Sequence, residues 1–260
     1  MKIYSPFILL LAASLACSTA AFPAPDPTAI PTSQPAATAT PNPSLTIAPL
    51  VFNEEGESPP YTIEAEFPAF AETDDPRAAA FNTLIHDLVM REVDRFRNNT
   101  LQNASNPPVG MGSFFYVQYS VIGHAADFWS IKFEMMVRAD GAVNAFTYSM
   151  PVNYDLQQGR EIALAELFLP NSDYLQKLSD YCKAELSTLA IALDKETFVQ
   201  GADPLPANYR SWNISHEGLV VTFDDYQYVT PTTGPQIITI PFGELEGIVD
   251  PESPVAPFLP

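Results

Sequence analysis

The sequence has little cysteine, little basic charge and no long apolar run, and each shortage narrows the class of protein. Its 260 residues include two cysteines, Cys17 and Cys182, too few for a disulfide-bonded scaffold. They include 12 Lys and Arg against 31 Asp and Glu, a formal net charge of −19. Residues 51–250 hold 11 of the former and 29 of the latter, a net charge of −18. This charge argues against nucleic acid and anionic membrane surfaces as partners, and it favours a cationic partner.

Motifs that carry catalysis are also missing. No serine lies in a G-x-S-x-G elbow, and no S-x-x-K motif, G-x-G-x-x-G fingerprint or phosphate-binding loop occurs. The three histidines, His86, His124 and His216, have no metal-ligand spacing with one another or with a cysteine, and we interpret each as a surface or boundary residue. We therefore predict no catalytic residue, no metal site and no cofactor.

The beginning of the chain predicts export. Residues 7–16, FILLLAASLA, follow a single positive charge at Lys2. This run has the length of a signal-peptide core and is shorter than the ~20 residues that span a bilayer. Leu15-Ala16-Cys17 fits a bacterial lipobox, although Ser14 stands where leucine is usual. We therefore predict residues 1–17 as a signal peptide with lipid attachment at Cys17, which would be the only membrane contact.

An ordinary signal cleavage is the alternative at this end. The small residues from Ser18 to Ala21 would suit a standard signal peptidase, and the mature protein would then be secreted without a lipid. Residues 18–54, rich in Pro, Ala and Thr, lack apolar periodicity and are predicted to form a disordered linker. Residues 251–260 are predicted to form a Pro-rich tail.

Two amphipathic helices are predicted. Residues 74–99 begin with Asp75 as N-cap and Pro76 at the first helical position, and an apolar face follows that Glu92 and Arg95 interrupt. Residues 170–193 form the second helix, capped by Asn171 or Ser172. Its apolar stripe includes Cys182, which we interpret as a buried packing thiol rather than a nucleophile.

Alternating residues predict the strands. Segments 114–122, 128–138 and 143–152 form an antiparallel meander with one buried face, and Asp140-Gly141 marks a hairpin. Segments 218–223 and 236–242 form a further strand pair. The predicted fold class is α+β, an antiparallel sheet packed with two main helices. We divide it into an N-terminal α+β part at 55–110 and a main domain at 111–250.

The loop between the last two predicted strands concentrates acidic and aromatic residues. It contains Asp224, Asp225, Tyr226 and Tyr228. One interpretation is a solvated turn. The other is a binding rim, because carboxylates beside tyrosines suit a cationic or carbohydrate partner.

Two segments of the chain resemble a known family. Residues 153–181, with Asn153-Tyr154-Asp155 and Gly159, and residues 212–245, with Ile240-Pro241, are similar to the extracytoplasmic RsiV-like domain, a domain of unknown function. The preceding segment, from residue 61 to about residue 98, resembles the small domain found in PdaC-type peptidoglycan deacetylases. The resemblance implies an α+β fold in the cell envelope.

One branch of that family consists of membrane-bound anti-sigma factors whose outer domain binds lysozyme. This sequence shows no transmembrane segment of the kind that such proteins carry. The resemblance therefore implies a non-catalytic, envelope-anchored binding module for a protein, such as a lysozyme-like one, or for a cell-wall glycan. A carboxylate-dependent enzyme acting on cell-wall polymer and an accessory envelope lipoprotein are the alternatives. The sequence leaves the oligomeric state open.

Overall fold

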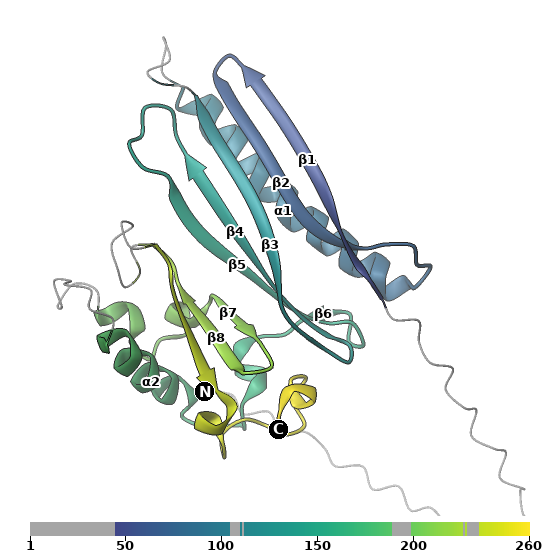
Figure 1. The fold of residues 1–260 in the computed structure, drawn as a ribbon, viewed down its shortest axis with the longest axis vertical. Helices are drawn as coiled ribbons and strands as arrows, with labels where there is room; N and C mark the ends of the chain where they lie inside the picture. The colour runs from purple at the N-terminus through teal and green to yellow at the C-terminus, as the bar shows by residue number, and fades with distance from the viewer. Residues whose placement is uncertain (1–44, 105–109, 111, 189–198, 226, 228–233) are drawn as a thin grey trace, which may run out of the picture. The chain divides into compact units, whose positions relative to one another are not determined.

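The computed structural model describes residues 45–104, 110, 112–188, 199–225, 227 and 234–260 (Figure 1). These residues form nine strands, two α-helices and several short 3-10 turns, which confirms the predicted α+β class. Cys17 and most of the predicted linker lie outside the described residues. None of the described helices combines the length and the apolar character needed to cross a membrane.

Six strands form the larger sheet, in the order β1-β2-β3-β4-β5-β6. Their bounds are β1 Ile47–Glu57, β2 Pro60–Phe70, β3 Ser113–Ala125, β4 Phe128–Arg138, β5 Phe146–Asp155 and β6 Arg160–Glu161. All neighbours are antiparallel except β2 and β3. That pair is parallel because the chain returns along helix α1 (Pro76–Gln102) between them. The predicted meander is therefore β3, β4 and β5.

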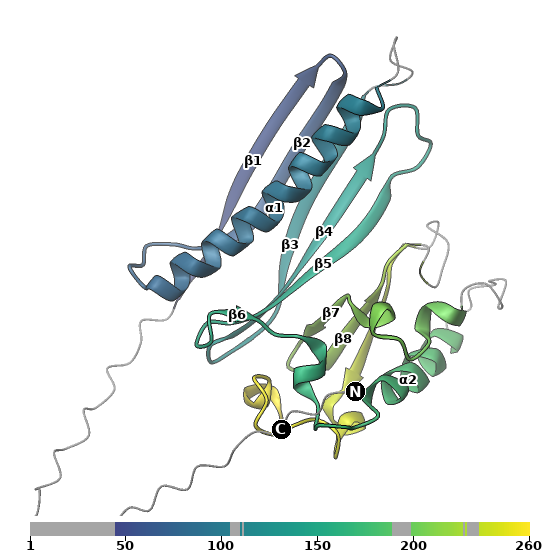
Figure 2. The same cartoon turned by 180° about the vertical axis from the view of Figure 1, so that it is seen from behind.

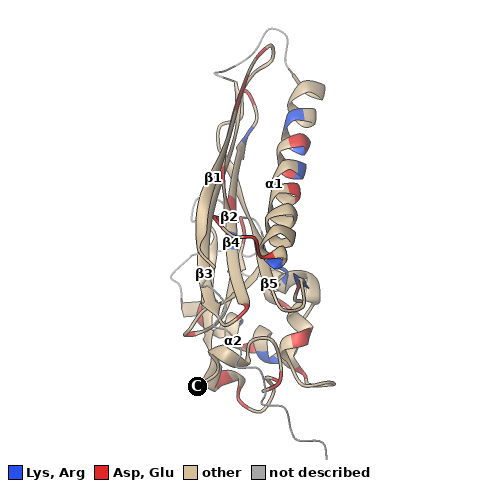
Figure 3. Ribbon diagram, turned by 90° about the vertical axis from the view of Figure 1, so that its right-hand side faces the viewer, with Lys and Arg blue, Asp and Glu red and all other residues tan. Residues whose placement is uncertain are grey.

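Helix α1 lies along one face of this sheet (Figure 2). As predicted, Asp75 caps the helix, since its Oδ1 accepts from the Arg77 backbone N–H at 2.9 Å, and Pro76 follows. The apolar stripe of α1 packs on the sheet side chains that point toward it, such as Ile63 and Phe133. Acidic and basic residues are interspersed along the rest of α1 (Figure 3).

A second, three-stranded antiparallel sheet packs with helix α2 around its own apolar core. Its strands are β7 Trp212–Ile214, β8 Gly218–Phe223 and β9 Gln236–Pro241, and α2 spans Tyr174–Thr188. The predicted cap was wrong, because α2 begins at Tyr174 and the residue directly before it is Asp173, while Asn171 has a left-handed φ of 63°. Cys182 is fully buried on α2, as predicted. The described residues also form five 3-10 turns: Leu164–Leu167, Val199–Ala202, Pro206–Tyr209, Phe242–Leu245 and Ala256–Phe258.

The two sheets meet at Ser130 on β4. The alternation of β4 predicted a single buried face, but Ser130 and Lys132 on the opposite face are buried too. Strand β7 covers them, and the Ser130 hydroxyl accepts from the Ile214 N–H at 2.8 Å. The first half of β4 therefore lies between α1 and the second sheet, and the buried Ser130 hydroxyl is satisfied there by hydrogen bonds.

The predicted boundaries need three corrections. Strand β1 starts at Ile47, inside the predicted linker 18–54, because its backbone pairs with β2 along its whole length. The Pro-rich tail 251–260 packs on the domain, since Val255 and Phe258 are buried in the second core. The predicted division at residue 110 is not a break in the fold, because β2 pairs with β3 across it.

Candidate functional site

A cavity of about 630 Å³ lies beside the C-terminal half of α1. We call it the α1 cavity. Its walls come from α1, the first residues of β3 and β5, the last residues of β4, and Arg210 in the segment before β7. Residues distant in the sequence thus converge on one space, which is the usual arrangement of a ligand site.

Aromatic rings form much of its wall. Phe96 of α1 stacks on Phe115 of β3 with ring centroids 5.4 Å apart. Phe146 and Tyr148 of β5 stack at 5.8 Å with an interplanar angle of 24°. Phe146 is 38% exposed, so its ring can contact a ligand. Two near-parallel aromatic rings at a cavity give a flat apolar surface with one hydroxyl on it.

Glu92 supplies a fixed polar group in the same wall. Its side chain is 7% exposed, and its Oε2 accepts from Arg95 Nη1 at 2.7 Å and from the Tyr148 hydroxyl at 3.1 Å. Burial, followed by the nearby Glu92 carboxylate, raises the pKa of Tyr148. Tyr148 therefore keeps its proton, and its ring position is fixed by the hydrogen bond to Glu92.

The rim opposite α1 is held by Asp140 in the β4–β5 hairpin. Asp140 Oδ1 accepts from the backbone N–H groups of Gly110 at 2.8 Å and Gly112 at 3.1 Å. The Asp140 N–H donates to Ser113 Oγ at 2.9 Å. These bonds join the hairpin to the segment that enters β3. The predicted hairpin is confirmed, with Gly141 at a left-handed φ of 77°.

The charge at the cavity differs from that of the domain. Among the described lining residues, Arg95 and Arg210 are cationic, and Glu92 and Asp140 are anionic. The wall is thus balanced, whereas residues 51–250 carry −18. Both carboxylates already accept hydrogen bonds from protein donors.

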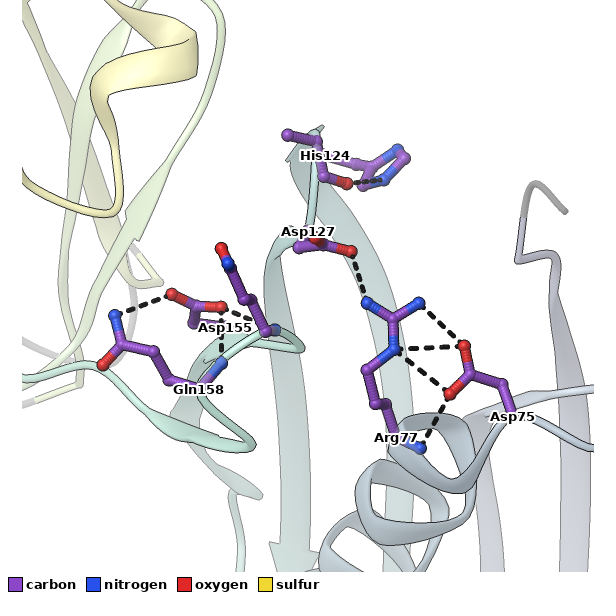
Figure 4. Close-up of polar contacts among 8 residues, drawn as sticks. Asp75, Arg77, His124, Asp127, Asp155 and Gln158 are labelled. Atoms are coloured by element: carbon purple, nitrogen blue, oxygen red, sulfur yellow. Dashed lines mark hydrogen bonds and ion pairs between the residues drawn. The ribbon is translucent and has the colours of Figure 1, made fainter. Parts of the chain in front are cut away.

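A second polar cluster lies at the far end of the sheet (Figure 4). Arg77 bridges two carboxylates, with Nη2 to Asp75 Oδ2 at 2.7 Å and Nη1 to Asp127 Oδ1 at 3.1 Å. Asp155 Oδ1 accepts from the backbone N–H groups of Gln157 at 2.7 Å and Gln158 at 3.0 Å. These carboxylates are occupied by protein donors, so the cluster fixes turns and the start of α1. The turn at residues 155–158 begins with the last residue of the Asn153-Tyr154-Asp155 motif.

The predicted binding loop is only partly described. Asp224 and Asp225 are 4% and 8% exposed. Asp224 Oδ1 accepts from the Ser149 N–H at 2.9 Å, and Asp225 Oδ2 from the Thr147 N–H at 3.2 Å. Burial raises the pKa of Asp224. The two carboxylates thus hold the edge of β5 and do not form an exposed rim.

The other predicted site residues are not placed by the structure. Tyr226 and Tyr228 lie outside the described residues, as does Cys17. Ligand binding by the loop and lipid attachment stay predictions. The predicted exposure of the three histidines is confirmed: His86, His124 and His216 all lie at the surface, and His124 stacks on Trp129.

Sequence reasoning missed the α1 cavity. Its one local signal was the pair Glu92 and Arg95, which interrupt an apolar helical face. The partner of Glu92, Tyr148, is 56 residues away in the chain, and Arg210 is farther still. Neither partner could be assigned from spacing.

Part of the chain matches a known protein family. Residues 165–243 match the model of a family described as "Protein of unknown function (DUF3298)", so the chain contains a DUF3298 domain. This range covers α2 and all three strands of the second sheet. The finer RsiV-like assignment is not part of this match.

Individual relatives extend the comparison. The chain is 28% identical over 134 residues to the peptidoglycan-N-acetylmuramic acid deacetylase PdaC of Bacillus subtilis, which is 51% of this chain and only 28% of the deacetylase. A DUF3298 member from Bacteroides fragilis matches with a TM-score of 0.61 and 14% identity, covering 83% of this chain and 97% of its own. A DUF3298 protein from Pseudomonas aeruginosa gives 0.53 and 15%, covering 80% and 95%. At such identities these two structures show a shared fold alone.

Proposed function

We propose that the protein is a non-catalytic, extracytoplasmic binding module, anchored at the cell envelope through Cys17, that binds a cell-wall glycan in the α1 cavity. The observation that carries the proposal is the joint presence in one cavity of the stacked rings of Phe146 and Tyr148 and the polar group of Glu92. Flat rings cover the C–H faces of sugars, while fixed polar groups orient their hydroxyls.

The comparisons support a ligand of this kind. The relative from Bacillus subtilis acts, by its name, on N-acetylmuramic acid in peptidoglycan. The similarity spans 28% of that protein, so its activity is not transferred here. What it supports is a cell-wall polymer as the ligand class.

The carboxylates of the cavity favour binding over hydrolysis. General acid–base catalysis needs a carboxyl group that is free to exchange a proton with substrate. Glu92 is engaged by Arg95 and Tyr148, and Asp140 by two backbone N–H groups. Asp224, whose pKa is raised, does not line the cavity. The arrangement therefore supports a binding module better than a carboxylate-dependent enzyme.

Sedimentation with purified peptidoglycan tests the proposal. The chain would be produced with Cys17→Ala, so that it is soluble without lipid. We expect it to sediment with the polymer, and Phe146→Ala to weaken binding on the order of tenfold. Phe114→Ala is the matched control, because Phe114 is a partly buried aromatic residue on the other face of the sheet. Equal binding by both variants, or no binding by the parent, would overturn the proposal.

A basic protein, such as a lysozyme-like one, is the second candidate. A groove of about 760 Å³ on the sheet face opposite α1 is lined by Glu55, Glu64 and Glu66. Such a face would speed association with a cationic partner, and salt would slow it. This interpretation retains the RsiV-like function that the sequence suggested. Surface plasmon resonance with lysozyme at two salt concentrations tests it, and a Glu64→Gln/Glu66→Gln chain with an unchanged association rate would remove this face from the interface.

The anchor has its own test. Mass spectrometry of the native N-terminus should find a diacylated or triacylated Cys17 if the lipobox interpretation is correct. A mature chain that begins at Ala21 without lipid would show ordinary secretion instead.

A further inference from the structure

We infer that the ligand of the α1 cavity carries a carboxylate, and that Arg210 and Arg95 bind it. In chemical terms the ligand is an acidic sugar rather than a neutral one. The inference rests on the proposed glycan-binding function and names the ligand class for that site. It starts from the guanidinium groups of these two arginines, which have N–H donors that bond to no described residue. The carboxylates of Glu92 and Asp140 in the same wall, by contrast, already accept from protein donors.

Arg210 is a charged side chain on a fixed segment of backbone, without an ion-pair partner among the described residues. It is exposed and lines the cavity, and it forms no hydrogen bond or ion pair with any residue that the structure describes. Its backbone is fixed on both sides. Tyr209 is fully buried, with its hydroxyl donating to the Ala202 carbonyl at 2.7 Å, and Ser211 is buried.

The charge of Arg210 has one internal effect. Together with Lys132 it lowers the pKa of Asp224, against the larger effect of burial, which raises it. Asp224 itself accepts from the Ser149 N–H. The guanidinium therefore influences a buried carboxylate without a described hydrogen bond to it, and its N–H groups keep capacity for an acceptor at the cavity that Arg210 lines.

Arg95 has spare donors as well. Only its Nη1 bonds to Glu92, at 2.7 Å, and its side chain is 60% exposed. Guanidinium groups bind carboxylates through two parallel N–H···O bonds. The Nε and Nη2 groups of Arg95 make no bond with the described residues, so they can contribute to an anion site in the cavity that Arg210 also lines.

Because the whole domain is strongly negative, an anionic ligand needs a local cationic site. A net charge of −18 on residues 51–250 repels anions at long range. An anionic ligand would therefore bind only where cations touch it directly. The cavity offers such a place, because its own carboxylates, Glu92 and Asp140, are already engaged by protein donors.

A neutral sugar would fit this wall less well. It would cover Arg210 and remove water from its guanidinium without supplying a charged acceptor, which is unfavourable. An acidic sugar places its ring on Phe146 and Tyr148 and its carboxylate on the two arginines. One ligand then contacts both the aromatic wall and the Arg210 guanidinium.

Calorimetry with two matched probes tests the inference. The first probe is the disaccharide of N-acetylglucosamine and N-acetylmuramic acid, which carries one carboxylate. The second is the same disaccharide with that carboxylate converted to its methyl ester. We expect the acid to bind the Cys17→Ala chain at least tenfold more tightly than the ester.

Variants of the arginines separate this inference from the proposed function. Arg210→Gln should reduce the tenfold preference to about twofold or less and leave binding of the ester unchanged, and Arg95→Lys should reduce the preference partly. Arg138→Gln is the control, because Arg138 lies over Phe114 at 4.7 Å, outside the cavity. Thermal melts confirm that each variant is folded.

Three outcomes decide between the possibilities. A preference for the acid that disappears in Arg210→Gln supports the inference. Equal binding of acid and ester, or equal loss of both in Arg210→Gln, overturns it and leaves the glycan-binding function standing. Binding of neither probe, together with failure to sediment with peptidoglycan, overturns the proposed function itself.

Discussion

Ser130 and Asn153 face each other across strands β4 and β5, and the Ser130 hydroxyl donates to Asn153 Oδ1 at 2.6 Å. The same hydroxyl accepts from Asn213 Nδ2 at 3.0 Å and from the Ile214 N–H at 2.8 Å. Asn153 Nδ2 in turn donates to the Trp212 carbonyl at 2.8 Å. This buried network joins the six-stranded sheet to the second sheet, so it holds the segment that contains Arg210 against the sheet whose strands line the α1 cavity.

Removing the Ser130 hydroxyl should destabilise the protein. Ser130→Ala leaves two buried N–H donors without this acceptor, and we expect a loss of about 2 kcal/mol in the free energy of unfolding. Urea denaturation measures it. Ser120→Ala is the control, because Ser120 is exposed on the neighbouring strand and should change the stability by less than about 0.5 kcal/mol. Equal effects of the two changes would show that the network does not stabilise the joint.

The ion pair of Glu54 and Arg97 should make stability depend on pH. Arg97 Nε donates to Glu54 Oε1 at 2.8 Å, and Tyr61 donates to the same atom at 2.6 Å. These bonds lower the pKa of Glu54 to about 2, from an ordinary value of 4.5. Because the folded-state pKa is depressed, the stabilisation is complete above pH 4.5 and is lost as the pH falls from 4.5 toward 2.

Substitution isolates this contribution from that of other carboxylates. Between pH 6 and pH 3, the free energy of unfolding of Glu54→Gln should fall by about 1 kcal/mol less than that of the parent. The difference is modest because the ion pair is partly solvated. Glu57→Gln serves as a control, since Glu57 is exposed on the same strand and forms no ion pair with the described residues. Parallel pH dependence of parent and Glu54→Gln would contradict the prediction.

Cys182 should be chemically inert in the folded protein. It is fully buried, and burial raises the pKa of its thiol to about 12, so almost no thiolate forms at pH 8. Thiol titration with a chromogenic disulfide should label Cys182 only after denaturation. In a Ser187→Cys chain, the thiol introduced at this exposed position of α2 should react quickly. Rapid native labelling of Cys182 would mean that α2 opens readily.

The C-terminal residues should contribute to stability. Phe258 is buried and packs edge-to-face on Phe128, with ring centroids 5.7 Å apart. Phe258→Ala should lower the free energy of unfolding by about 3 kcal/mol, seen as a lower thermal midpoint by circular dichroism. Pro257→Ala, at an exposed neighbour, should have little effect. An unchanged midpoint in Phe258→Ala would restore the interpretation of residues 251–260 as a free tail.

The candidate site shows where reasoning from sequence stops. Glu92 was visible as an interruption of an apolar helical face, yet only the fold brings it to Tyr148 and Arg210. Asp224 and Asp225 were visible as an acidic pair, but their burial depends on strand β5, whose Ser149 and Thr147 N–H groups they accept from. The residue pattern of one segment does not indicate which backbone N–H groups elsewhere in the chain will need a hydrogen-bond acceptor.

Sequence alone determined the elements whose causes are local. Asp75-Pro76 starts α1, the alternation in β4 makes a strand, the Asp140-Gly141 pair turns the hairpin, and the stripe on α2 buries Cys182. Only the tertiary structure decided that β1 begins within the Pro-rich region, that Phe258 returns to the core and that both faces of β4 are covered. Periodicity and capping report how a segment satisfies its own hydrogen bonds and one apolar face, whereas burial of a second face and convergence of charged groups depend on segments far away in the chain.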